Sequence, residues 1–181
     1  MKGMVFTGFL DMVESAFGLE TVDYIIENSD LQSQGVYTSV GTYDFVEMVS
    51  LITNLSEKVA LPVNTLLYEY GKYFFDTLAS SHSDIFKQYS SPISLLSSVE
   101  SHIHVHVRKI YPNAELPTFD VVEETNDSIQ MIYKSERSLY SFAHGLMEKT
   151  FDHYESKAMI SYELLNEKGT EVKFIINKIY E

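Results

Sequence analysis

Apolar residues recur at helical spacing near the start of the chain. Residues 2–17 carry two apolar stripes, formed by Val5, Phe9 and Val13 and by Phe6, Leu10 and Phe17. A helix with two apolar stripes contacts two parts of a structure at once. We therefore predict a first helix that ends at Gly18, a shorter helix over about 20–28 and a loop over 32–41.

Three more helices are predicted before residue 112. Thr42 is expected to cap a helix whose apolar residues recur between positions 45 and 59. Pro62 suits the first turn of the next helix. A further helix is predicted over 91–110, because a Ser-Pro pair opens it and Tyr111-Pro112 ends it.

The last third of the chain changes to a two-residue period. A strand is predicted over 119–123, and after a turn Ile129, Met131 and Tyr133 alternate with other residues as in a half-buried strand. The remaining predicted elements are a helix over 138–154 and strands over 160–164 and 172–176.

This order of elements predicts an α+β fold in a single domain, residues 1–181. An N-terminal helical subdomain would comprise residues 1–60. Residues 61–181 would form the second subdomain, with a four-stranded antiparallel sheet and helices.

Composition and charge exclude several classes of function. The chain has 26 acidic and 13 basic residues and a net charge of −13, so neither nucleic acid nor an anionic membrane is an expected partner. The absence of cysteine excludes disulfides and thiolate metal sites. No apolar run reaches about 18 residues, and Asp11 and Glu14 interrupt the apolar start. We therefore expect a cytoplasmic protein without a membrane span or signal peptide.

Three of the six histidines alternate at positions 102, 104 and 106. On a strand they would share one face and form a metal-binding triad. The predicted helix over 91–110 separates them and places His104 on the apolar face, with His106 near its other edge. Periodicity favours His104 without excluding His106. A buried histidine with a purely structural role is the alternative to a ligand such as the proximal histidine of haem.

Tyr133, Ser135 and Arg137 lie where the second predicted strand meets a helix. Ser135 is expected to cap that helix, whose amino terminus favours negative charge. Arg137 can bind a carboxylate through two parallel hydrogen bonds. The segment therefore predicts a site for a carboxylate or phosphate, with an ordinary strand-to-helix turn as the alternative.

Several short motifs occur in a characteristic order. They are Met1-Lys2-Gly3, Val36–Tyr43, Glu69–Phe75, His104–Pro112, Leu116–Phe119, Tyr133-x-Ser135-x-Arg137 and His144-Gly145-Leu146. Over essentially the whole chain they resemble the H-NOX family of haem-nitric oxide/oxygen binding domains, in its stand-alone bacterial form. The family is related to the haem domain of soluble guanylate cyclase.

The resemblance implies haem b as the cofactor and assigns roles to the residues. His104 would be the iron ligand, Tyr133, Ser135 and Arg137 would bind the propionates, and Pro117 would hold the macrocycle bent. The pocket on the gas-binding side would contain Val5, Phe9, Phe74, Phe142 and Leu146. Phe142 stands where oxygen-binding members have a tyrosine, so we expect stable complexes with nitric oxide and carbon monoxide but not with oxygen.

A sensor without catalytic activity is therefore the predicted function. Nitric oxide would break the iron–histidine bond, and the conformational change would regulate a separate histidine kinase or cyclic-di-GMP enzyme. The alternatives are a haem enzyme of the peroxidase or NO dioxygenase type and a cofactor-free adaptor. Some relatives have a cysteine-based zinc site, which this chain lacks.

Overall fold

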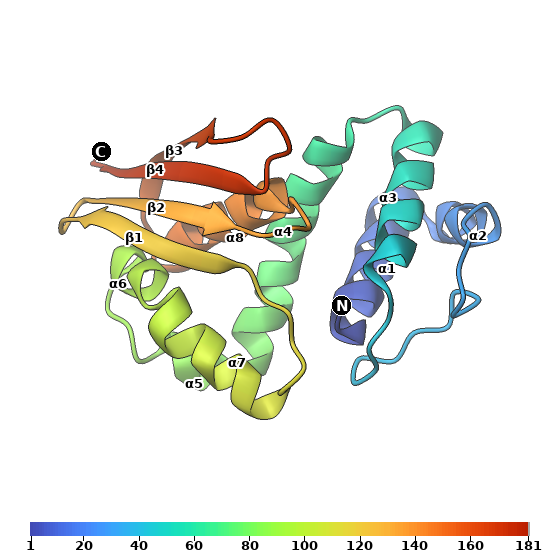
Figure 1. Ribbon diagram of the computed structural model, residues 1–181, viewed down its shortest axis with the longest axis horizontal. Helices are drawn as coiled ribbons and strands as arrows, with labels where there is room; N and C mark the ends of the chain where they lie inside the picture. Colours follow the sequence, from blue (N-terminus) through green and yellow to red (C-terminus); the bar gives the residue numbers. More distant parts are fainter. Residues whose placement is uncertain (181) are drawn as a thin grey trace.

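A computed structural model of the protein describes residues 1–180. Figure 1 shows the N-terminal helices on one side of the molecule and a four-stranded sheet on the other, with a long helix between them. The first side contains α1 (Gly3–Phe17), α2 (Leu19–Glu27) and α3 (Phe45–Val59), and the helix in the middle is α4 (Val63–Ser81). The predicted α+β fold is confirmed.

The helix ends near the amino terminus follow simple backbone rules. Gly18 ends α1 at φ 85°, a conformation that glycine adopts without steric cost. Asp44, and not Thr42, caps α3: its carboxylate accepts a hydrogen bond of 3.0 Å from the Val46 amide. The prediction for Thr42 was wrong because this residue lies before the helix, in an isolated β-bridge with Lys2.

The single helix predicted over 91–110 is divided into three pieces. After the short α5 (Ser83–Phe86), the chain forms α6 (Pro92–Ser97), a π-helical turn η1 (Val99–Ile103) and α7 (His104–Ile110). The Ser91-Pro92 pair opens α6 as predicted, and Ser91 caps the helix through a reciprocal pair of hydrogen bonds with Ser94. The wider π turn was not predicted, because the apolar spacing over this segment was interpreted as one continuous helix.

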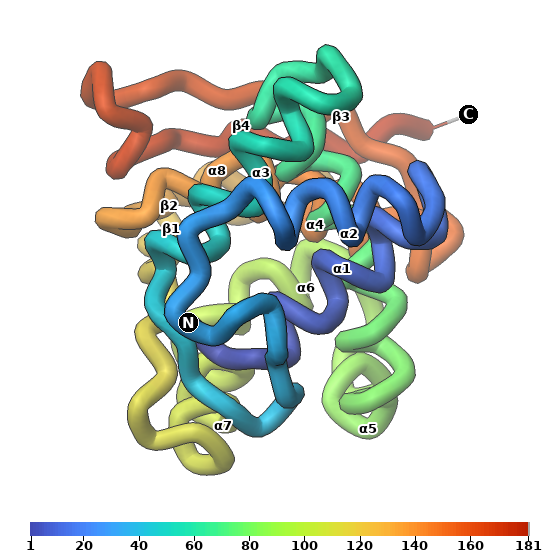
Figure 2. Tube along the Cα trace, turned by 90° about the vertical axis from the view of Figure 1, so that its right-hand side faces the viewer, coloured from blue at the N-terminus to red at the C-terminus, as the bar shows by residue number. Residues whose placement is uncertain are grey.

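The sheet has the order β1-β2-β4-β3, and all neighbouring strands are antiparallel. Its strands are β1 (Thr118–Glu124), β2 (Ser128–Lys134), β3 (Lys157–Leu164) and β4 (Glu171–Ile179), and α8 (Tyr140–His153) connects β2 to β3. Met131 and Phe174 are register partners, and every second residue of β2 and β4 is buried around them. Figure 2 shows the sheet and the N-terminal helices from the side.

Two apolar cores divide the molecule. The first joins α1, α2, α3 and one face of α4, and the second joins the sheet to α6 and α8. Helix α4 thus packs with the N-terminal helices through Leu67, Tyr70 and Phe74. The subdomain boundary at residues 60 and 61 stays a prediction. Within residues 1–180, no helix combines the length and the apolar character that crossing a membrane requires.

Candidate functional site

A large cavity lies between the two cores. Its volume is about 820 Å³, within the range of about 300–1,000 Å³ that is typical of ligand sites. It is lined mainly by apolar and aromatic side chains from α1, α3, α4, α6 and α8, and from the segment between α7 and β1. Of the predicted site residues, His104, Pro117, Tyr133, Ser135, Arg137, Val5, Phe74, Phe142 and Leu146 all line it.

His104 is the buried histidine of the alternating three. It is 9 % exposed and starts α7, whereas His102 and His106 are exposed. Its Nδ1 lies 3.0 Å from the Glu100 carboxylate, and its ring packs at 5.9 Å from that of Phe119. The strand-type triad is therefore not formed, and no group of three metal-ligating side chains occurs within residues 1–180.

The π turn directly before His104 places this residue at the cavity. The amide of His104 bonds to the carbonyl of Val99, five residues earlier, and so closes the π turn. Such single π turns are frequent at functional sites. Burial lowers the pKa of His104, while the Glu100 carboxylate acts in the opposite direction. The net shift is downward, so the imidazole is neutral at neutral pH.

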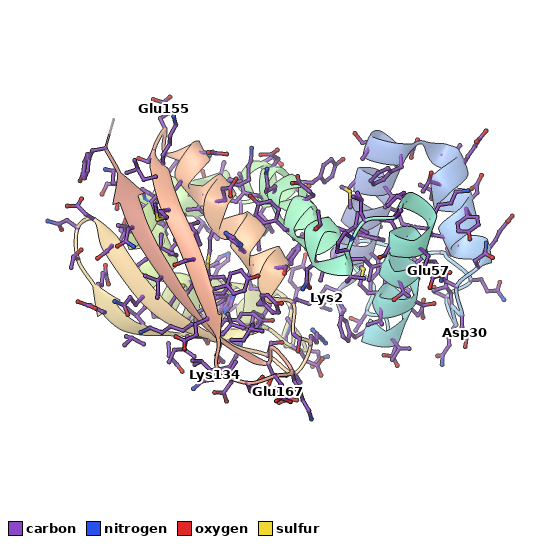
Figure 3. The ribbon with its side chains drawn as sticks, turned by 90° about the horizontal axis from the view of Figure 1, so that it is seen from above. Lys2, Asp30, Glu57, Lys134, Glu155 and Glu167 are labelled. Carbon is purple, nitrogen blue, oxygen red and sulfur yellow. The ribbon has the colours of Figure 1, made fainter. Side chains whose placement is uncertain are left out.

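Arg137 forms the basic part of the cavity lining. Its Nη1 donates to the Glu115 carbonyl at 2.9 Å, its Nη2 pairs with the Glu115 carboxylate, and its guanidinium lies 5.4 Å from the Phe45 ring centre. Lys2, labelled at the junction of the two parts in Figure 3, lines the same cavity. This arrangement favours a ligand with negative charge at this edge.

The hydroxyl groups of Tyr133 and Ser135, beside Arg137, both accept hydrogen bonds from backbone amides. Ser135 does not cap α8, which begins only at Tyr140; its Oγ accepts from the Arg137 amide at 3.2 Å within a preceding turn. The Tyr133 hydroxyl accepts from the Leu139 amide at 2.9 Å, where α8 starts. The prediction for Ser135 was wrong because residues 135–138 form a turn of their own, in which Ser138 has φ 50°.

A second part of the lining, the aromatic wall, consists of Val5, Tyr70, Phe74, Phe142 and Leu146. The Phe142 ring centre lies 5.0 Å from that of Tyr70 and 5.7 Å from that of Phe74. Tyr70 is 1 % exposed, and its hydroxyl donates to the Val5 carbonyl. The sequence reasoning missed Tyr70, although its spacing from Leu67 and Phe74 places it on the same helical face.

Phe9 is not among the described residues that line the cavity. It is fully buried and packs edge-on against Tyr70, with the ring centres 5.4 Å apart. From α1, Met4 and Val5 line the cavity, although Val5 belongs to the same predicted stripe as Phe9. Phe9 therefore supports the aromatic wall from behind.

The cavity also contains a polar side chain that the sequence analysis did not single out. His82, at the end of α4, lines the cavity, and its Nδ1 is buried without a hydrogen-bond partner among the described residues. Buried polar atoms usually have a partner. This nitrogen is thus an exception within a largely apolar lining.

The residues of the cavity fit a haem group. A flat aromatic ring needs apolar and aromatic walls, its iron accepts a neutral imidazole, and its propionates need a cation and hydrogen-bond donors. His104 supplies the imidazole on the side of α7. Arg137, which binds the Glu115 carboxylate in this structure, has the geometry to bind a propionate in the same way.

Comparisons with known proteins agree with this fit. The model of the haem-NO-binding family matches residues 2–162. A search of curated proteins finds no match. Among solved structures, the Fe(II) unliganded H-NOX protein from K. algicida has 54 % identity and a TM-score of 0.98, covering 100 % of this chain and 98 % of that chain.

Two further solved structures are similar over nearly their whole length. The IWP-051-bound H-NOX from Shewanella woodyi, in the Fe(II)CO state, has 39 % identity and a TM-score of 0.83, covering 99 % of this chain and 95 % of that one. The H-NOX protein from S. oneidensis, in the Fe(II)NO state, has 26 % identity and a TM-score of 0.91, covering 99 % and 100 %. The chain therefore belongs to the haem-NO-binding, or H-NOX, family.

Proposed function

We propose that this protein is a haem-based nitric oxide sensor that binds haem b and regulates a separate signalling partner. One observation carries the proposal: the buried neutral imidazole of His104 and the carboxylate-binding guanidinium of Arg137 line the same largely apolar cavity. Membership of the haem-NO-binding family supports it.

Each predicted residue has a role in this proposal. His104 would ligate the iron, and Arg137 with the hydroxyl groups of Tyr133 and Ser135 would hold the propionates. Pro117 would press against the ring and keep it bent. The aromatic wall would surround the gas, with Phe9 holding Tyr70 in place.

The aromatic wall favours nitric oxide and carbon monoxide over oxygen. Bound oxygen carries partial negative charge and gains from a hydrogen-bond donor, which the other two gases do not need. Phe142 has no donor, and the Tyr70 hydroxyl already donates to the Val5 carbonyl. The Thr150 hydroxyl likewise donates to the Leu146 carbonyl at 2.8 Å.

The signal would start at His104. Haem held by His104 would supply a ferrous iron that binds nitric oxide, and binding of the gas would release the His104 side chain. His104 is the first residue of α7, directly after the π turn, and Pro117 follows α7 by a short segment. Release of the His104 side chain would therefore free α7 and this segment to move, as a two-state element requires.

The partner in this proposal is a histidine kinase or a cyclic-di-GMP enzyme on a separate chain. The net charge of −13 would complement a basic docking surface. In reconstitution with a candidate kinase, the unliganded and NO-loaded protein should change autophosphorylation to different extents. Equal effects of the two forms would contradict the switch.

The absorption spectrum tests the haem site directly. The purified protein should show a haem spectrum that His104→Ala changes and that imidazole restores in this variant. His106→Ala is the matched control, since His106 is exposed on the same helix and should leave the spectrum unchanged. An unchanged spectrum in His104→Ala would overturn the assignment. Absence of haem would favour the adaptor, and peroxide turnover would favour the enzyme.

A further inference from the structure

Three charged or titratable side chains form a row along η1 and α7. His104 Nδ1 lies 3.0 Å from one oxygen of Glu100, and the Arg108 guanidinium binds the other oxygen of Glu100 through two nitrogens, at 3.1 and 3.2 Å. The residues are spaced by four positions and share one helical side. The Glu100 carboxylate is thus held between the imidazole and a fixed cation.

This row determines which imidazole nitrogen carries the hydrogen. An ionised carboxylate only accepts hydrogen bonds, so the His104 Nδ1 must donate. The Arg108 guanidinium donates two hydrogen bonds to the other oxygen of Glu100 and so holds this carboxylate in its ionised form. The neutral imidazole therefore carries its free lone pair on Nε2, the nitrogen that remains available as a ligand.

We propose that Glu100 is a positioning residue that fixes the tautomer of His104 and strengthens Nε2 as a ligand, and that Arg108 limits this effect by drawing charge from the carboxylate. The inference rests on the proposed function, in which His104 ligates iron. Carboxylates that accept from a ligating histidine orient its ring and raise its basicity.

The row lies within the helical segment that would move when His104 is released. Glu100, His104 and Arg108 all lie between the start of η1 and the end of α7. The hydrogen bonds that join the three side chains lie within this segment, whereas the imidazole also interacts with the backbone of Pro117. The contacts of Glu100 with His104 and Arg108 can therefore stay intact when α7 moves. A released His104 would keep its tautomer and could bind again without rearranging its protons.

A purely structural role for the row makes a different prediction. If Glu100 and Arg108 only stabilised the π turn, removal of either would disturb His104 in the same direction. The proposal requires opposite directions: loss of the carboxylate weakens the ligand, and loss of the counter-ion strengthens it. The variants Glu100→Gln and Arg108→Gln separate the two cases.

The first measurement uses the haem-free protein and does not depend on the proposed function. The ¹⁵N chemical shifts of the His104 imidazole should report hydrogen on Nδ1 in the unmodified protein. In Glu100→Gln the population with hydrogen on Nε2 should increase. Identical tautomer populations in the two proteins would overturn the inference.

The second measurement uses the ferrous protein with haem. The iron–histidine stretching frequency should fall in Glu100→Gln and rise in Arg108→Gln. Nitric oxide should release the histidine faster in the first variant and more slowly in the second, by about tenfold, the lower end of typical effects of such residues. Lys109→Gln is the matched control, because it removes a charge from an exposed neighbour on the same helix.

An unchanged frequency in either variant, or shifts of the same sign in both, would overturn the inference. Failure of the proposed function is distinguishable from this result. It would appear as an unchanged haem spectrum in His104→Ala, whereas failure of the inference leaves His104 as the ligand and changes only the variants of its neighbours.

Discussion

Gly145 of α8 lies against the carbonyl oxygen of Tyr68 on α4, so closely that a Cβ atom at Gly145 would be 2.1 Å from this oxygen. Gly71 makes the reciprocal approach, since a Cβ atom at Gly71 would be 2.1 Å from the Phe142 carbonyl oxygen. The backbones of the two helices thus touch where they cross. Because Tyr70 precedes Gly71 in sequence and the Phe142 backbone lies against Gly71, the crossing sets the positions of both rings in the aromatic wall.

Gly145→Ala should destabilise the fold. The added methyl group must push α8 away from α4, and overpacking of this kind costs about 1–3 kcal/mol. Helix propensity alone would make alanine more stable than glycine by about 1 kcal/mol. Urea unfolding of the haem-free protein therefore distinguishes the two effects by sign, and a gain in stability would contradict the close crossing.

Several features of the fold follow from local sequence patterns. Alternation of Ile129, Met131 and Tyr133 identified β2, and the structure buries all three residues. The long apolar stripe around position 104 predicted a helix, which separates the three alternating histidines and buries only His104. In both cases a repeated pattern over several residues records which side faces the core.

Other features depend on contacts that local patterns do not record. Val5 and Phe9 lie on one predicted stripe of α1, but only Val5 lines the cavity, whereas Phe9 packs against Tyr70. Spacing along one stripe does not indicate which of its residues borders a cavity, because this depends on the position of α4. The sequence likewise indicates only a surface carboxylate at Glu100, and the structure shows that the π turn places it beside His104.

Arg137→Ala should weaken haem binding. Hydrogen bonds to charged groups contribute about 1.5–3 kcal/mol, which corresponds to a haem dissociation rate about 10- to 100-fold higher. Transfer of haem to apomyoglobin measures this rate. Lys134→Ala is the control: Lys134 pairs with Asp120 at 2.9 Å on the sheet and does not line the cavity. Figure 3 shows it at the end of the sheet, on the same side as Glu167. Equal rates in the two variants would contradict the role of Arg137.

His144 should make the stability of the fold depend on pH. Its ring lies among those of Tyr68, Tyr162 and Phe174, with centre distances of 5.1, 5.8 and 6.2 Å. Burial lowers its pKa, and Glu148 acts in the opposite direction. Below the unfolded pKa of about 6.5 the unfolded chain binds more protons, so stability falls as the pH decreases toward the lowered folded pKa.

His144→Phe should remove this contribution and retain the ring contacts. One such group changes the free energy of unfolding by at most about 1.4 kcal/mol per pH unit. His104 shifts in the same direction, so the relevant measurement is the difference between the two proteins. Urea unfolding at about pH 7.5 and about pH 5.5 gives this difference. Equal pH dependence in both proteins would show that His144 does not contribute.

The ferrous protein should form no persistent oxygen complex in air, as measured by its absorption spectrum. The aromatic wall offers no free donor, since the hydroxyl groups of Tyr70 and Thr150 already donate to backbone carbonyls. His82 is a candidate that could contradict this, because it lines the cavity and its buried Nδ1 has no partner among the described residues. If an oxygen complex does form, His82→Leu tests its origin. Loss of the complex in that variant would identify His82 as the donor, and its persistence would contradict the argument from the aromatic wall itself.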